Sequence, residues 1–585
     1  MRRPWADSVL NFFRLQFIPA TSLLLLLASP IAAETTPISL SQNYDYQDTR
    51  NLVSIVNDAA ALVQSKGEAA FADFSVDGSR WRQGERYIFV IDPSGTMLVH
   101  PDPALEGKEE MELKDIDGRP IIRGLIHAAT VDPAKPEGWY HYQWPVPGQI
   151  LPRWKSSYVR LVTAPSGKRY IVGSGIYNDR MEKSFVVDLV DNAAAEIKTN
   201  PQVAYAHFRD PIGPYRVKDA YIFVIDPTGV DLVNPAFPNL EGQNLLKQKD
   251  SEGKPMIQEM LNVARTSGSG WVDYMWPKPG ESVPTQKSAY VRKVETSDGW
   301  LVVGCGVYLA NAPRISSAAR VMTASQLMEL VRKGAAVLEK QGEAAFPEFR
   351  RKGSKWFGDH TYFLVTSMDG TRVLHAADPS LEGKSIANMK DILGRPYGQM
   401  FLDTASGPSG EGWVHYMYPK PGDIFPAWKS TFVKRVTFPS GQQYLIGCGV
   451  YDMQMNRTFI EDVVIQAAEL IASQGEAAFP VIRNKNGPFV FMDTYVFVLT
   501  PDGTQVVNAA FPSLEGKNIL DLKDRAGNPV IREEIKAAQK HGNAWLSVDW
   551  YRPGQNTPAP EETYVVEVRS GSQTFIVGSG YYPQD

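Results

Sequence analysis

One strand-like segment recurs four times along this chain of 585 residues. The copies read GWYHYQWP, GWVDYMWP, GWVHYMYP and AWLSVDWY, with their first tryptophans at Trp139, Trp271, Trp413 and Trp545. Neighbouring copies are therefore 132, 142 and 132 residues apart. Solenoid repeats are about 20–50 residues long, whereas whole domains are commonly about 100–150 residues. The spacing predicts four tandem copies of one small domain, which we number one to four.

The segments between the copies predict the domain boundaries. We expect the copies at residues 45–180, 181–310, 325–454 and 455–585, with an Ala/Ser-rich connector at 311–324. Copies one and three share features that copies two and four lack, which indicates that an existing pair was duplicated. Because few residues separate the members of a pair, we expect a semi-rigid rod of two pairs.

The amino terminus, residues 1–33, has the pattern of a secretory signal peptide. Arg2 and Arg3 precede an apolar run containing LLLLLA, and small residues end at Ala33. The run is too short to span a bilayer comfortably, so we expect cleavage after Ala33 and a periplasmic or secreted protein. An uncleaved membrane anchor is the alternative. With 60 basic and 65 acidic residues, the chain lacks the concentrated positive charge that nucleic-acid binding needs.

The pattern within one copy predicts an α+β domain. Copy one begins with apolar residues at helical spacing from Thr49, followed by a hairpin signal in RYIFVIDPSGTMLVHP. The segment KDIDGRP then leads into a short helix, and three further strands follow. This order predicts a long amino-terminal helix and an antiparallel five-stranded sheet in every copy.

Two motifs have a structural interpretation that competes with a chemical one. Cys305 and Cys448 stand between glycines where the other copies have Ser174 and Ser579. This exchange favours small buried side chains over a disulfide or a reactive thiol. The segment KDIDGRP resembles the start of a calcium loop, but the twelve-residue ligand pattern is missing, so we interpret it as a turn and helix cap.

Several blocks of copy one return in order, with small changes, in the other copies. They are YIFVIDPSGTMLVHPDPALEGKEEMELKDIDGRP, GWYHYQWPVPG, KSSYV and VGSGIY. These blocks resemble the Cache family of extracellular sensor domains, in the single-Cache type 2 pattern, and the resemblance covers nearly everything after residue 45. It implies a PAS-like sheet that binds a small molecule, often a short organic acid or an amino acid. Most relatives belong to chemoreceptors or histidine kinases; this chain shows no signalling module, so we expect a separate membrane partner.

Polar and aromatic residues at matched positions are the candidate ligand contacts. A lysine precedes the fourth predicted strand, where it is suited to pair with a carboxylate. A tyrosine and a second aromatic residue lie on one face of the third strand, and a histidine or an asparagine ends the hairpin; only the histidine gains charge near neutral pH. The candidates are His100, Tyr142, Trp144, Lys155, Asn234, Tyr274, Trp276, Lys287, His375, Tyr416, Tyr418 and Lys429.

Copy four departs from this pattern. It has Val548 in place of the tyrosine and Glu561 in place of the lysine. A carboxylate ligand would meet repulsion there, so we expect copy four not to bind the ligand of the other copies. We interpret the Trp139 series as structural, because all four copies keep its ring.

Taken with the resemblance, these residues favour a sensor that binds short organic acids or amino-acid-like ligands. The alternative is a scaffold whose degenerate modules bind another protein. No GxSxG, HExxH or glycine-rich phosphate loop occurs, so we predict no enzyme, no catalytic residue and no cofactor. His100 and His141 recur as His375 and His415, which leaves a two-histidine metal site open, although we assign no metal ligand.

Overall fold

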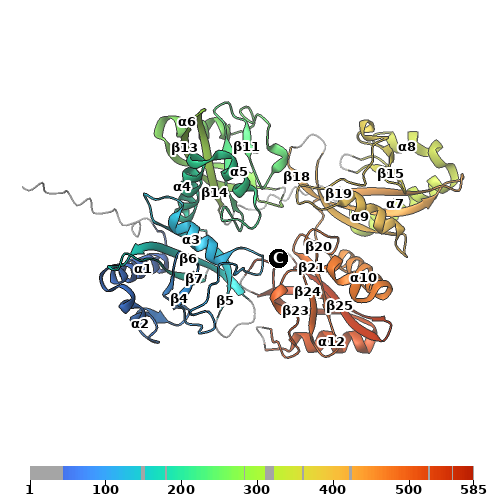
Figure 1. Ribbon diagram of the computed structural model, residues 1–585. Coiled ribbons are helices and arrows are strands. Elements are labelled where there is room, and N and C mark those ends of the chain that lie inside the picture. Colours follow the sequence, from blue (N-terminus) through green and yellow to red (C-terminus); the bar gives the residue numbers. More distant parts are fainter. Residues whose placement is uncertain are drawn as a thin grey trace, which may run out of the picture.

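The computed structural model describes residues 44–146, 152–177, 181–281, 283–309, 322–358, 361–420, 424–524, 527–555 and 558–583. The expected signal peptide and most of the expected connector lie outside these residues. The described chain forms four modules, one for each predicted copy, and every module has a sheet flanked by helices (Figure 1).

Modules one and two repeat one order of elements: a long helix, a hairpin, a short helix and three long strands. Module one consists of α1 (Gln47–Lys66), η2 (Gly67–Ala70), α2 (Phe71–Phe74), β1 (Arg82–Gln83), β2 (Arg86–Tyr87), β3 (Phe89–Ile91), β4 (Met97–Val99), α3 (Ile121–Thr130), β5 (Glu137–Pro145), β6 (Pro152–Thr163) and β7 (Arg169–Tyr177). Module two consists of α4 (Lys183–Thr199), α5 (Pro201–Arg209), β8 (Arg216–Val217), β9 (Ala220–Tyr221), β10 (Phe223–Ile225), β11 (Asp231–Val233), η3 (Pro238–Leu240), α6 (Met256–Ser267), β12 (Ser269–Pro277), β13 (Pro284–Thr296) and β14 (Gly299–Tyr308).

Modules three and four follow the same order. Module three consists of α7 (Ala324–Gln341), η4 (Gly342–Ala345), α8 (Phe346–Arg350), β15 (Phe363–Ser367), β16 (Arg372–His375), η5 (Pro379–Leu381), α9 (Tyr397–Ser406), β17 (Glu411–Pro419), β18 (Pro426–Thr437) and β19 (Gln443–Tyr451). Module four consists of α10 (Arg457–Gln474), η6 (Gly475–Ala478), α11 (Phe479–Arg483), β20 (Val490–Phe491), β21 (Thr494–Leu499), β22 (Gln505–Asn508), η7 (Pro512–Leu514), α12 (Val530–His541), β23 (Asn543–Tyr551), β24 (Pro558–Ser570) and β25 (Gln573–Tyr581).

The sheets are antiparallel, with the hairpin strands at one side and the long strands at the other. In module one the strand order is β4-β3-β7-β6-β5, and modules two and three have the same order in their own strands. Module four adds the short β20 beside β21. The predicted α+β fold with a five-stranded antiparallel sheet is therefore confirmed.

Each sheet has a core on both faces. In module one, Val56 of α1 packs in one core with Trp139 of β5, and Leu125 of α3 packs in the other with Tyr142 of the same strand. Alternate residues of a strand point to opposite faces, so Trp139 and His141 face the long helix while Tyr140 and Tyr142 face the short one. The face under the short helix is the one that carries the predicted ligand contacts.

A glycine ends the long helix of module one, and the prediction that the two cysteines are small buried side chains is confirmed. Gly67 ends α1 with a φ of +62°, a conformation that glycine adopts more easily than other residues. Cys305 and Cys448 are buried and unbonded, and burial raises the pKa of both thiols to about 12, so they are not reactive nucleophiles.

The KDIDGRP segment forms a turn, as predicted, but does not cap the helix. Asp115 Oδ1 accepts hydrogen bonds from the backbone nitrogens of Asp117 and Arg119, both at 2.9 Å. Its Oδ2 accepts from the backbone nitrogen of Gln143 at 3.0 Å, which ties the turn to β5. The residue before α3 is Pro120, which has no capping side chain, so the helix-cap part of the prediction is wrong.

The modules pack as two equivalent pairs, which agrees with duplication of a pair. Asp188 of α4 accepts a hydrogen bond from the backbone nitrogen of Trp139 in module one at 2.9 Å. Asp462 of α10 accepts the same bond from Trp413 in module three at 3.1 Å. In each pair, the long helix of the second module thus binds the edge strand of the first.

A buried arginine makes a second contact within each pair. Arg119 of module one donates to the carbonyl oxygen of Gly213 in module two at 3.0 Å, and Arg395 of module three donates to that of Val490 in module four. The second modules have lysine or asparagine at this position, in KDSEGKP and KDRAGNP. The arginine therefore distinguishes the first module of a pair from the second.

The expected rod is wrong, because the chain folds back on itself (Figure 1). Lys485 of module four lies beside module one, with its Nζ 2.7 Å from Asp117 Oδ1. Asn239 of module two donates to the carbonyl oxygen of Ile424 in module three at 2.7 Å. Within the described ranges, no helix combines the length and apolar character needed to cross a membrane.

Candidate functional site

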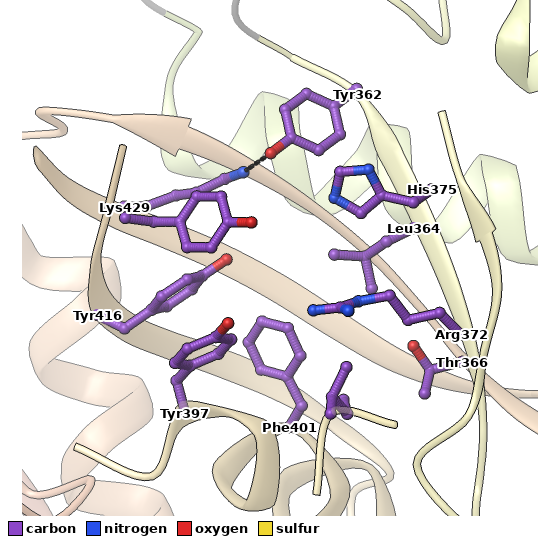
Figure 2. A pocket seen from close by; sticks show the side chains of 11 residues that line it. Tyr362, Leu364, Thr366, Arg372, His375, Tyr397, Phe401, Tyr416 and Lys429 are labelled. Atoms are coloured by element: carbon purple, nitrogen blue, oxygen red, sulfur yellow. Dashed lines mark hydrogen bonds between the residues drawn. The ribbon is translucent and has the colours of Figure 1, made fainter. Parts of the chain in front are cut away.

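A small cavity lies between the sheet and the short helix α9 of module three (Figure 2). Its volume is about 20 Å³, which is room for about one water molecule. The lining residues are Tyr362, Leu364, Thr366, Arg372, His375, Ile386, Tyr397, Phe401, Tyr416, Tyr418 and Lys429. All four residues predicted from copy three are among them.

Lys429 of β18 is buried in the wall of this cavity. Its side-chain nitrogen donates to the Tyr362 hydroxyl at 2.7 Å and lies 4.0 Å from the centre of that ring (Figure 2). Burial lowers the pKa of Lys429 to about 7, and the nearby Cys448 opposes this shift. No acidic side chain contributes to the pKa of Lys429, so its charge has no counter-ion among the described residues.

Modules one and two bury the equivalent lysine. Lys155 of β6 donates to the Tyr87 hydroxyl at 2.7 Å. Lys287 of β13 lies 4.0 Å from the centre of the Tyr221 ring, and its Nζ has no hydrogen-bond partner in the part of the chain that the structure describes. Burial lowers the pKa of Lys155 to about 7 and that of Lys287 to about 8. The sequence had predicted that these lysines precede the long strand. The structure places all three within the strand.

The second glycine of the GSG or GCG motif makes room for this lysine. A Cβ atom on Gly449 would lie 2.8 Å from Lys429 Cε, and one on Gly175 would lie 2.4 Å from Lys155 Cε. Carbon atoms do not approach so closely without displacement, so the lysine requires glycine on the neighbouring strand. The repeated motif therefore marks the position of a buried charged side chain, which is a lysine in modules one to three. The sequence-based prediction did not use this signal.

The predicted aromatic residues also lie as strand alternation suggested. Tyr416 and Tyr418 both line the cavity, and the Tyr416 ring stacks on Tyr397 with 4.6 Å between the ring centres. The Tyr416 hydroxyl lies 3.1 Å from Thr431 Oγ1. In modules one and two, Tyr142, Trp144, Tyr274 and Trp276 occupy the same positions against the short helix.

The histidines and asparagines at the end of the hairpin share a structural role. His375 Nδ1 accepts a hydrogen bond from the backbone nitrogen of Asp378 at 3.0 Å, and Asn508 Oδ1 accepts one from Phe511 at 2.8 Å. Asn234 does the same for the turn of module two. Burial lowers the pKa of His100 and His375 to about 4, so the expectation that they gain charge near neutral pH is wrong.

A two-histidine metal site does not form in module one. His100 lies against Tyr87 and Trp144, while His141 stacks on Trp139 on the other face of the sheet. His415 stacks on Trp413 in the same way in module three. No group of three or more metal-binding side chains occurs in the part of the chain that the structure describes.

One lining position, which the sequence-based prediction missed, has a different kind of side chain in every module. It is the first residue of the second hairpin strand: Met97, Asp231, Arg372 and Gln505. All four are buried. The sequence did contain a signal for this position: copies two, three and four have an acid, a base and an amide where copy one has the apolar Met97.

The charged members of this set, Asp231 and Arg372, form no ion pair within the described residues. The Arg372 guanidinium points into the cavity (Figure 2) and donates to Met389 Sδ at 2.9 Å. Asp231 Oδ2 accepts from Asn234 at 2.8 Å, whereas its Oδ1 has no partner among the described residues. Burial raises the pKa of Asp231 to about 7, and Lys287 opposes the shift from a distance without forming an ion pair.

In module two, the aromatic residues beside this position contact the neighbouring pair. Phe425 of module three packs on Trp276 and Phe237, with 4.8 Å and 5.6 Å between ring centres. Trp276 is one of the predicted ligand contacts. The loop of module three therefore covers one side of the candidate site of module two.

A family model described as a Cache domain matches residues 75–182, 200–318, 314–466 and 471–585. The methyl-accepting chemotaxis protein McpP of Pseudomonas putida is 36% identical over 91 residues, 16% of this chain and 16% of that protein. The sensor histidine kinase MctS of Rhizobium johnstonii is 36% identical over 103 residues, 17% of this chain and 22% of that protein. The matches thus span less than a quarter of these relatives.

Solved structures of sensor domains are similar to single modules. A periplasmic sensor domain of a chemotaxis protein is 32% identical, over 21% of this chain and 85% of that one, with a TM-score of 0.18. A Cache chemosensory domain described for carboxylic acid recognition is 28% identical, over 21% and 90%, with a TM-score of 0.19.

Proposed function

Because the chain belongs to the Cache family of sensor domains, we propose that it is a small-molecule sensor whose modules one to three each bind a ligand through a carboxylate. The observation that carries this proposal is the buried lysine, Lys155, Lys287 or Lys429, which forms no ion pair with an acidic side chain among the described residues. Asp219 and Asp231 raise the pKa of Lys287 only from a distance, and burial still lowers it to about 8. Burying an ammonium group without a counter-ion costs several kcal/mol. A ligand carboxylate supplies that counter-ion and a charge-assisted hydrogen bond.

We propose that the residue at the start of the second hairpin strand, which differs in every module, selects the second functional group of each ligand, beside its carboxylate. Met97 suits a monocarboxylate with a short apolar tail, because it adds no charge. Asp231 suits a ligand that also carries an ammonium group, as an amino acid does. Arg372 suits a second carboxylate. The cavity of module three is too small for a dicarboxylate as it stands, so binding there requires lining side chains to move outward.

The proposed role is sensing outside the cytoplasm, with the signal passed to a separate membrane protein. Its support is that McpP and MctS are a chemotaxis protein and a sensor kinase, and that residues 1–33 have a signal-peptide pattern. The competing proposal is a scaffold that binds another protein through its outer surface. In a scaffold, the buried lysines would have no ligand.

A ligand screen on the full chain separates the two proposals. We expect propionate, alanine and succinate each to raise the melting temperature, because a ligand at 100 times its dissociation constant stabilises the folded state by about 2.7 kcal/mol. Isothermal titration calorimetry then gives the number of sites for each compound, with one site expected for succinate. If no carboxylate shifts the melting temperature at 10 mM, the scaffold proposal is favoured.

The proposed binding depends on pH in a defined direction. In the free protein, the lowered pKa means that Lys155 and Lys429 lose their proton as the pH rises through about 7. A bound carboxylate raises the pKa again, so binding at pH 8 takes up close to one proton. The dissociation constant should rise about tenfold per pH unit above 7 until the pKa of the complex is reached.

Calorimetry in phosphate and in Tris at pH 8 measures this proton uptake, because the two buffers differ in their heat of ionisation. Equal heats in both buffers, with a dissociation constant that does not change between pH 6.5 and 8.5, would contradict a lysine-centred site.

A further inference from the structure

Two wall positions of the candidate site change to acids in module four. Glu561 of β24 replaces Lys429, and Glu534 of α12 replaces Phe401. Both side chains are buried, with exposed fractions of 5% and 3%. A Cβ atom on Gly580 would lie 2.1 Å from Glu561 Oε1, so the glycine that makes room for the lysine in other modules makes room for a carboxyl group here.

These acids have no positively charged partner in the described ranges of the chain. Burial raises the pKa of Glu561 well above its usual range, and Glu534 and Asp493 raise it further. Burial alone raises the pKa of Glu534 to about 8. Arg552 is the nearby cation, and it acts on Asp493 and not on the two glutamates.

Polar atoms around these acids are also unsatisfied. Glu534 Oε2 and Thr563 Oγ1 are buried without a hydrogen-bond partner among the described residues. Thr563 occupies the position of Thr431, whose hydroxyl meets Tyr416 in module three. Val548 stands in place of that tyrosine, so the hydroxyl has lost its partner. The site has lost three tyrosine and phenylalanine rings of module three, those of Tyr416, Phe401 and Tyr397, because Val530 stands in place of Tyr397.

Aromatic rings surround the rest of the site. Trp550 donates to the Tyr495 hydroxyl at 2.9 Å, and Phe511 lies 5.7 Å from the Tyr495 ring centre. Tyr582 lies close enough to Glu561 for the carboxyl charge to raise its pKa. Carboxylates within an aromatic wall attract an organic ammonium group, which binds ring faces as well as anions.

We propose that module four binds a small organic cation between Glu534 and Glu561, at the place where modules one to three hold their lysine. Two neighbouring buried carboxyl groups resist ionising together, and a ligand ammonium group between them stabilises the ionised form of both. The rings of Trp550 and Tyr495 favour an alkylammonium ion over a metal ion, which would require more oxygen ligands than this wall offers. This module would then respond to ligands of the opposite charge to those of its neighbours.

The test is calorimetry on the full chain at pH 8 with 1,4-diaminobutane and tetramethylammonium chlorides, and with sodium chloride as the blank. We expect one cation site per chain. Glu561→Gln and Glu534→Gln should each weaken binding at least about 30-fold, since each removes one partner of a buried charge pair. Neither variant should melt below the parent protein, because each replaces a buried acid, whose ionisation burial disfavours, by a neutral amide of similar size.

Two control variants sharpen this test. Glu562→Gln changes the next residue of β24, an acid that pairs with Arg457 on the surface, and should leave cation binding unchanged. Lys429→Met should remove binding of a carboxylate in module three without affecting the cation. The proposal is overturned if neither amine binds at 10 mM, if sodium chloride gives the same heat, or if both glutamine variants bind like the parent. These outcomes do not depend on whether modules one to three bind carboxylates. The two proposals can therefore fail separately.

Discussion

Lys429→Met is expected to weaken succinate binding by about 30-fold or more, because removing one partner of a buried charge pair costs about 2–5 kcal/mol. Methionine has a similar length and no charge, so its side chain still fills the space beside Gly449 that the lysine methylene groups occupy. The variant should melt at or above the temperature of the parent, since the free protein no longer buries an unpaired ammonium group. Calorimetry on the full chain measures the affinity, and a thermal melt measures the stability.

Lys434→Met is the matched control for this prediction. Lys434 lies on the same strand, β18, and pairs with Glu411 at 2.7 Å. Its loss should leave succinate binding within twofold of the parent. Propionate and alanine should still bind the Lys429→Met variant through modules one and two. Unchanged succinate affinity after the loss of Lys429 would rule out the carboxylate site in module three.

Trp139→Ala is expected to destabilise module one by about 3–5 kcal/mol, the usual cost of removing a large buried aromatic side chain. Trp139 is 3% exposed, its ring centre lies 4.5 Å from that of Phe185 in module two, and its Nε1 donates to the Tyr44 hydroxyl at 2.9 Å. The loss therefore weakens both the core of module one and its contact with module two. A multidomain chain does not unfold in one step, so scanning calorimetry should follow the separate transitions.

Trp271→Ala is the comparison, because this equivalent tryptophan is only partly buried. The transition that includes module one should fall by roughly 6–20 °C in Trp139→Ala, and the loss in Trp271→Ala should be clearly smaller. Binding of succinate by module three should persist in both variants. Equal losses of stability in the two variants would show that the contact with module two does not add to the destabilisation caused by Trp139→Ala.

Much of the candidate site could be predicted from the sequence because it depends on local periodicity. Tyr416 and Tyr418 are two residues apart in one strand, so they had to share a face, and the repeat identified Lys429 as their companion. The charge state of these groups could not be predicted in the same way. The pKa of a lysine or a histidine depends on burial by residues from other strands, which is why His375 proved to be neutral.

The variable position at Met97, Asp231, Arg372 and Gln505 was missed for a related reason. Its residues follow a hairpin turn, where polar side chains are common and carry no special meaning. Only the pairing of β15 with β16 and β19 brings Arg372 to the wall that Lys429 and Phe401 share. Glu534 was likewise one of two adjacent acids, with Glu533, on a predicted short helix, and the pattern did not show which of them is buried.

The sequence by itself determined the number of modules, the α+β fold of each one and the face of the sheet that carries the tyrosines, because the repeat period and the alternation of a strand are local properties. The tertiary structure alone decided the rest. It showed that the modules pair through Asp188 and Asp462 and that the chain folds back. It also showed that a lysine or two acids are buried under each short helix without an ion pair to another described residue. These features depend on contacts between residues far apart in the chain, whose distances and burial no local pattern encodes.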